Sequence, residues 1–110
     1  MRKDLIAIST KTGLTFIRRK AIIYCLSDGS YAHIYLEGGR KLTVSKNLKE
    51  VEAILADDSF FRIHHSHLIN LEHARNFINN NHNCVKTSNG EELSVARNRK
   101  KEFLALFVRL

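Results

Sequence analysis

Closely spaced turn signals are the feature of this sequence that most restricts its fold. The stretches 9–13, 27–30 and 37–40 are rich in glycine, serine and other turn-forming residues. Such residues accept the backbone angles that tight chain reversals need. The runs between them are rich in β-branched and aromatic residues, as is typical of strands. The sequence therefore predicts five short strands in hairpins, over residues 5–8, 14–19, 21–26, 31–36 and 41–44.

A change in hydrophobic period after residue 44 indicates a helix. Apolar residues recur there at helical spacing, namely Leu48, Val51, Ile54 and Leu55. Asn47 is followed three residues later by Glu50, an arrangement typical of a capping box. These features predict a helix over 47–56, which ends at the polar residues 57–59.

Strand and turn signals return in the last third of the chain. Runs 74–78 and 83–87 are expected to be strands joined by an asparagine-rich turn, and the Asn-Gly pair at 89–90 leads into a further strand at 92–95. The terminal stretch 98–110 favours a helix with its phenylalanines on one side. No proline, linker or repeat divides the sequence, so we expect a single domain over 1–110.

Composition narrows the classes of function. The chain has 110 residues, of which 44% are hydrophobic, and no apolar run is long enough to span a membrane. Cys25 and Cys84 are far apart and form no CxxC pair, which favours reduced thiols in a cytoplasmic protein. The formal net charge of +7 indicates a polyanionic partner, nucleic acid first and an anionic membrane surface second.

The segment 60–71, FFRIHHSHLINL, is the first candidate for a site. Its apolar residues can anchor it to a core, while its polar residues cannot all be buried without partners. His64, His65 and His67 suggest either a general base or metal ligation. However, no catalytic motif accompanies them, and neither helical i, i+4 spacing nor a cysteine pair completes a metal site. We therefore expect no enzyme activity, no resident metal and no cofactor.

DNA binding fits the same residues better, because cationic side chains are interleaved with amides and hydroxyls that can reach phosphates and base edges. Two such clusters stand out: Arg62, His65, Ser66 and Asn70, and then Arg97, Asn98, Arg99, Lys100 and Lys101. Plainer explanations exist for each. The second cluster can be a solvated helix face, Asn70 a backbone-capping residue, and His64 a partly buried structural histidine.

Several ordered motifs together resemble LytTR-type DNA-binding domains. The segment 60–71 is similar to the family signature, in which a Phe-Arg-x-His-Arg-Ser core is followed by an apolar pair and asparagine. Asp-Gly-Ser-Tyr at 28–31, Leu-Lys-Glu at 48–50, the Asn-Gly turn at 89–90 and Leu-Ser-Val-Ala-Arg-Asn at 93–98 extend the likeness over about residues 10–108.

The resemblance implies a mostly β (α+β) fold of about ten short strands in small packed sheets, with two helices. It also implies sequence-specific binding of double-stranded promoter DNA through loops, by the output domain of a bacterial two-component response regulator whose full-length chain carries a receiver domain. Such domains bind paired direct repeats as dimers and bend the DNA. The implied DNA-binding residues are Tyr31, His65, Ser66, Arg97 and Asn98, with Arg62 and Lys100 as further candidates for phosphate contacts. Within the signature, we expect His64 and Asn70 to be structural.

Two positions depart from the family pattern. His65 stands where arginine is usual, and histidine cannot form the arginine fork to guanine. Ala96 replaces the usual serine before Arg97, which removes a hydroxyl. These departures motivate an alternative, a protein-interaction or regulatory module with a degenerate DNA-binding face. A histidine at 65 also predicts that DNA binding strengthens as pH falls, because a charged imidazole is a better partner for phosphate.

Overall fold

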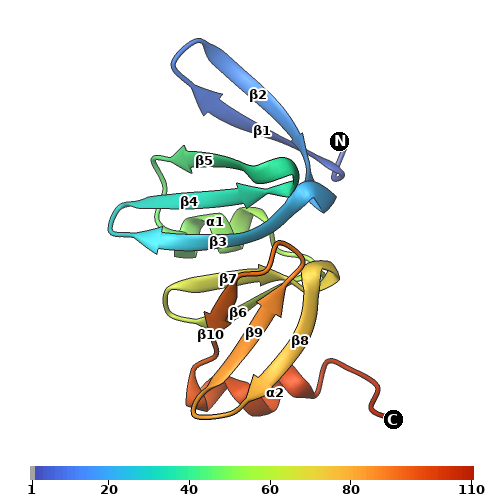
Figure 1. Cartoon of the computed structure of the whole chain (residues 1–110). Coiled ribbons are helices and arrows are strands. Elements are labelled where there is room, and N and C mark those ends of the chain that lie inside the picture. Colours follow the sequence, from blue (N-terminus) through green and yellow to red (C-terminus); the bar gives the residue numbers. More distant parts are fainter. Residues whose placement is uncertain (1) are drawn as a thin grey trace.

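Three antiparallel sheets follow one another along the long axis of the computed structural model, which describes residues 2–110 (Figure 1). The first sheet pairs β1 (Leu5–Thr10) with β2 (Gly13–Arg18). The middle sheet has the order β5-β4-β3-β7-β6 and consists of β3 (Ile22–Asp28), β4 (Tyr31–Leu36), β5 (Arg40–Val44), β6 (Phe60–His64) and β7 (His67–Asn70). The third has the order β10-β9-β8 and consists of β8 (Ala74–Asn79), β9 (Asn83–Thr87) and β10 (Glu92–Ser94). The mostly β architecture predicted for the chain is therefore confirmed.

The helix α1 (Leu48–Ile54) forms where the hydrophobic period changes. Both hydrogen bonds of the predicted capping box are present. The Glu50 backbone N–H donates to Asn47 Oδ1 at 2.9 Å, and the Asn47 N–H donates to Glu50 Oε1 at 3.1 Å. Leu48 and Val51 are buried against the middle sheet. Local capping and one apolar face thus define this element.

The C-terminal helix is shorter than the predicted stretch 98–110. The 3₁₀ turn Arg97–Arg99 comes first, and α2 covers only Lys100–Leu104. Phe103 is buried, whereas Phe107 is 41% exposed and Val108 is 97% exposed. Because short helices depend on burial of an apolar face, nothing supports further helical turns beyond Leu104.

The middle sheet is covered on both faces, which explains the unbroken apolar run at the start of β3. One core cluster includes Ile22 and Cys25 and packs under α1 and the first hairpin. A second cluster includes Ile23 and Tyr24 and packs toward the third sheet and α2. A strand buried on both faces needs apolar residues at consecutive positions rather than alternating ones.

The β1–β2 hairpin is a two-stranded sheet of its own, attached to the rest by a few contacts. Ile8 and Ile17 are buried in the first core cluster. The Arg19 guanidinium, just after β2, donates to the backbone oxygens of Lys3 at 2.7 Å and Leu55 at 3.0 Å. Side-chain contacts rather than strand pairing therefore hold the hairpin.

Candidate nucleic-acid interface

Three connections lie on one side of the molecule: the β3–β4 turn, the β6–β7 turn and the segment between β10 and α2 (Figure 1, left). Hydrogen bonds fasten them to one another. The Ser27 N–H donates to Ser66 O at 3.0 Å, and the Ala96 N–H donates to Ile63 O at 2.8 Å. We call this side of the molecule the three-loop edge. It brings together predicted site residues from three distant parts of the sequence: Tyr31, then His65 and Ser66, then Arg97 and Asn98.

The β3–β4 turn carries Tyr31, which is exposed at the first position of β4. The turn is held by the His33 ring, whose Nε2 lies 2.9 Å from Asp28 Oδ2 and whose Nδ1 lies 2.8 Å from Thr43 Oγ1. Gly29 has a φ of 61°, which glycine adopts without strain. His33 therefore links the turn to β5 and fixes the backbone that presents Tyr31.

The signature segment forms a hairpin whose two-residue turn is His65-Ser66, between the paired residues His64 and His67. Ile63 and Leu68 are fully buried and anchor the two strands. The His64 ring centroid lies 4.2 Å from that of His65 and 4.8 Å from that of His67. His65 is exposed and Ser66 partly exposed at the tip. The hairpin thus gathers three histidine rings at its turn, with His64 stacked on His67 and tilted against His65.

Arg62, an expected phosphate contact, has its guanidinium bonded to three groups of the chain itself. Its Nε donates to His64 O at 2.9 Å, its Nη1 donates to Glu52 Oε1 at 2.8 Å, and its Nη2 donates to His65 O. The two turn carbonyls need donors, and Arg62 supplies them while pairing with α1. This geometry makes Arg62 a residue that positions the turn rather than a free phosphate ligand.

Asn70 is fully buried at the end of β7. Its Nδ2 donates to Ile22 O at 2.8 Å, and its Oδ1 accepts from the Glu72 N–H at 3.0 Å. The side chain therefore joins β7 to the start of β3 and caps the turn that follows. It has no access to a ligand from this position.

Arg99 is a positioning residue that was in the predicted basic cluster but not among the DNA-binding residues implied by the family resemblance. Its Nε donates to Arg62 O at 3.0 Å, and its guanidinium lies 4.7 Å from the Phe61 ring centroid. Its Nη1 also pairs with Glu102 at 3.0 Å. Arg99 thus binds the 3₁₀ turn to β6. In the sequence Arg99 is one of several neighbouring cations. Only its contact with β6 in the folded chain shows that it is a structural residue and not a free cation.

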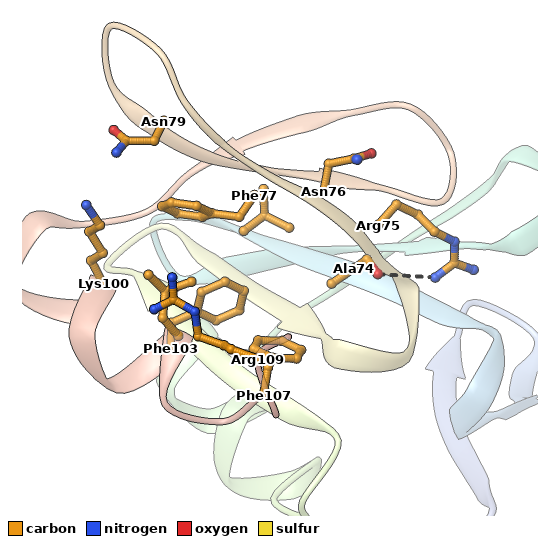
Figure 2. A pocket seen from close by; sticks show the side chains of 11 residues that line it. Ala74, Arg75, Asn76, Phe77, Asn79, Lys100, Phe103, Phe107 and Arg109 are labelled. Atoms are coloured by element: carbon orange, nitrogen blue, oxygen red, sulfur yellow. Dashed lines mark hydrogen bonds between the residues drawn. The ribbon is translucent and has the colours of Figure 1, made fainter.

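Arg97 and Asn98 differ from Arg99 in being exposed. Within residues 2–110, Arg97 forms no ion pair. Lys100 lies further along, half-buried, with its Nζ 5.8 Å from the Phe77 ring centroid (Figure 2). Arg97 is therefore a free guanidinium on the three-loop edge, held by a turn that Arg99 fastens down.

Acidification is expected to destabilise the fold through His64. Burial lowers the pKa of His64, and the neighbouring His67, His65 and Arg62 charges lower it further. The unfolded chain then binds more protons than the folded one as pH falls below about 6.5, so the free energy of unfolding decreases. Denaturant unfolding of the parent chain and His64→Asn, at about pH 7.5 and about pH 5.5, measures this contribution.

The same measurement on His82→Asn is the control, because His82 is exposed in the β8–β9 turn. We expect the loss on acidification to shrink in His64→Asn and to stay unchanged in His82→Asn. Full retention of the pH dependence in His64→Asn would contradict the assignment.

Residues 2–110 contain neither a membrane-spanning helix nor a cluster of metal ligands. No helix in that range is both long enough and apolar enough to cross a membrane. No group of three or more His, Cys, Asp and Glu side chains in that range is placed to hold a metal ion.

Comparisons with known proteins identify the fold and the family of this chain. The LytTr DNA-binding domain of a protein described as a methyl-accepting/DNA response regulator from Bacillus cereus has the same fold. Its TM-score is 0.79 at 22% sequence identity, over 96% of this chain and 97% of that one. A search of curated proteins gives no match. The family model of the LytTr DNA-binding domain matches residues 12–107. The fold is thus that of a LytTr domain.

The chain belongs to the LytTr DNA-binding domain family, a family of DNA-binding domains and not of enzymes. The resemblance of its sequence motifs to that family is confirmed.

Proposed function

We propose that this chain binds double-stranded promoter DNA in a sequence-specific manner through the three-loop edge, as the output domain of a bacterial two-component response regulator. One observation carries the proposal. Three turns lie on one side of the molecule and are cross-linked by backbone hydrogen bonds. Their guanidinium, amide, imidazole and hydroxyl groups are exposed or partly exposed. These are the groups that contact phosphates and base edges. The formal net charge of +7 supports the same partner.

The proposed role of each side chain follows from its exposure and from whether it already has a partner within the chain. Arg97 donates to a base edge or a phosphate, because its guanidinium is exposed and unpaired within residues 2–110. Asn98 and Ser66 provide further donors and acceptors, and His65 provides one hydrogen bond. Tyr31 contacts the DNA from the β3–β4 turn. Lys100 contributes a phosphate contact from the end of the edge, and Arg62 acts indirectly by holding the His65-Ser66 turn.

The proposal extends to the assembly in which the domain works. We propose that the domain binds paired direct repeats as a homodimer. We also propose that the full-length protein carries a receiver domain and is cytoplasmic. The family and the fold of the Bacillus cereus domain support this setting.

Selection of bound sequences from a random pool of duplex DNA tests the function. We expect enrichment of a defined motif by the parent chain. Absence of enrichment would favour the alternative of a protein-interaction or regulatory module, to which the His65 and Ala96 departures point.

Salt is expected to weaken DNA binding steeply. With about three phosphate contacts per domain, a fourfold rise in salt would weaken binding roughly 40-fold by counterion release. A mobility-shift titration from about 50 mM to about 200 mM salt measures the slope. Lys100→Ala should reduce the slope by about one, whereas Lys11→Ala, in the β1–β2 turn, should leave it unchanged. A flat affinity across this range would count against binding through phosphates.

A further inference from the structure

A groove of about 710 Å³ lies between β8 and the C-terminal segment. In Figure 1, β8 and the C-terminal tail lie on the other side of the molecule from the three-loop edge. The groove is lined by three phenylalanines, Phe77, Phe103 and Phe107 (Figure 2). Phe107 is 41% exposed although it contacts Phe103 edge-on, with ring centroids 5.2 Å apart. An aromatic surface therefore remains open to solvent after folding.

The rim of this groove is positively charged. Lys100, Arg109 and Arg75 line it, and no carboxylate is among its lining residues. None of these three cations forms an ion pair within residues 2–110. Arg75 donates only to the backbone oxygens of Glu72 and Ala74. The charge of the rim is thus uncompensated by the protein itself.

The aromatic walls and the cationic rim together define the kind of ligand that the groove would bind. Apolar and aromatic walls favour a flat apolar body, since aromatic rings pack edge-to-face or offset on one another. Uncompensated cations next to those walls favour an anionic group, and hydrogen bonds to charged groups are the stronger ones. The volume lies within the range of about 300–1,000 Å³ that is usual for small-molecule sites.

We propose that this groove binds a small organic anion with an aromatic body, such as an aryl carboxylate or aryl sulfonate. The aromatic body lies against Phe77, Phe103 and Phe107, and the acid group lies between Lys100 and Arg109. In Figure 2 these two side chains stand beside the phenylalanines, whereas Arg75 extends away from them. The groove shares Lys100 with the proposed DNA-binding edge, but its aromatic walls and Arg109 come from β8 and the C-terminal segment and have no part in the proposed DNA contacts.

A pair of dyes that differ only in charge tests the proposal. We would titrate the isotopically labelled full chain with 8-anilinonaphthalene-1-sulfonate and with its uncharged counterpart N-phenyl-1-naphthylamine. The sulfonate is expected to bind more tightly, with amide shift changes confined to β8 and residues 100–109. Lys100→Ala/Arg109→Ala should weaken sulfonate binding about tenfold or more and leave binding of the neutral dye unchanged.

Two further variants make the result specific. Phe107→Ala should weaken both dyes, because it removes an aromatic wall that either dye would contact. Lys11→Ala/Arg40→Ala removes the same charge from other surfaces and should change neither. Equal affinity for the two dyes, or sulfonate affinity that survives loss of Lys100 and Arg109, would overturn the proposal. So would shift changes centred on the separate groove between the β1–β2 hairpin and α1.

Discussion

Arg97→Ala is expected to weaken binding to the selected DNA motif by about 1–3 kcal/mol, or roughly 5- to 160-fold. The reason is geometric. A planar guanidinium can form two parallel hydrogen bonds to one base edge or phosphate, and the 3₁₀ turn holds this one exposed on the three-loop edge. Lys100 is expected to matter less, since an ammonium makes a salt-sensitive contact without the same directionality.

A competition mobility shift with the selected motif and a scrambled duplex measures the effect. Arg40→Ala is the matched control, because Arg40 is also exposed and begins β5 away from the three loops. We expect Arg97→Ala to lose affinity for the motif more than for the scrambled duplex. Unchanged affinity for the motif would remove Arg97 from the interface.

Asn70→Ala is expected to lower the free energy of unfolding by about 3 kcal/mol. The substitution leaves the Ile22 carbonyl and the Glu72 N–H without their side-chain partner and opens a cavity in a fully buried position. Urea unfolding followed by far-UV circular dichroism measures the loss.

Asn76→Ala is the control for this prediction, because Asn76 is exposed on β8 and the substitution removes the same atoms. Its effect should be within about 0.5 kcal/mol. A comparably small effect of Asn70→Ala would show that its two hydrogen bonds contribute little. DNA affinity, corrected for the folded fraction, should stay unchanged in Asn70→Ala because the side chain is inaccessible.

Local signals predicted most of the fold. The glycine turns and the capping box of α1 act over a few residues, so they can be read directly from the sequence. The β6–β7 hairpin could not be predicted in this way. Its turn residues, His65 and Ser66, include no glycine, asparagine or aspartate, and the hairpin is fixed by burial of Ile63 and Leu68. The length of α2 likewise depends on how much of its apolar side is covered.

The candidate site could be predicted less completely than the fold, because the role of each side chain depends on its tertiary contacts. Sequence motifs identified the segments, but could not distinguish exposed cations from those with internal partners. Arg62 is held by Glu52 and two turn carbonyls, and Arg99 by a β6 carbonyl and the Phe61 ring. These partners come from other elements or from the fold of a turn. The contacts of Tyr31, His65, Ser66, Arg97 and Asn98 with DNA stay a prediction.

The separateness of the β1–β2 sheet has a consequence for hydrogen–deuterium exchange. A two-stranded hairpin is marginally stable on its own, and this one depends on Ile8, Ile17 and the two backbone contacts of Arg19. We expect its amides to exchange as one early cooperative unit, while β3, β4 and β7 exchange only on global unfolding. The turns around Tyr31 and Ser66 are built on those slowly exchanging strands. The hairpin can therefore open and close without carrying the turns of the three-loop edge with it.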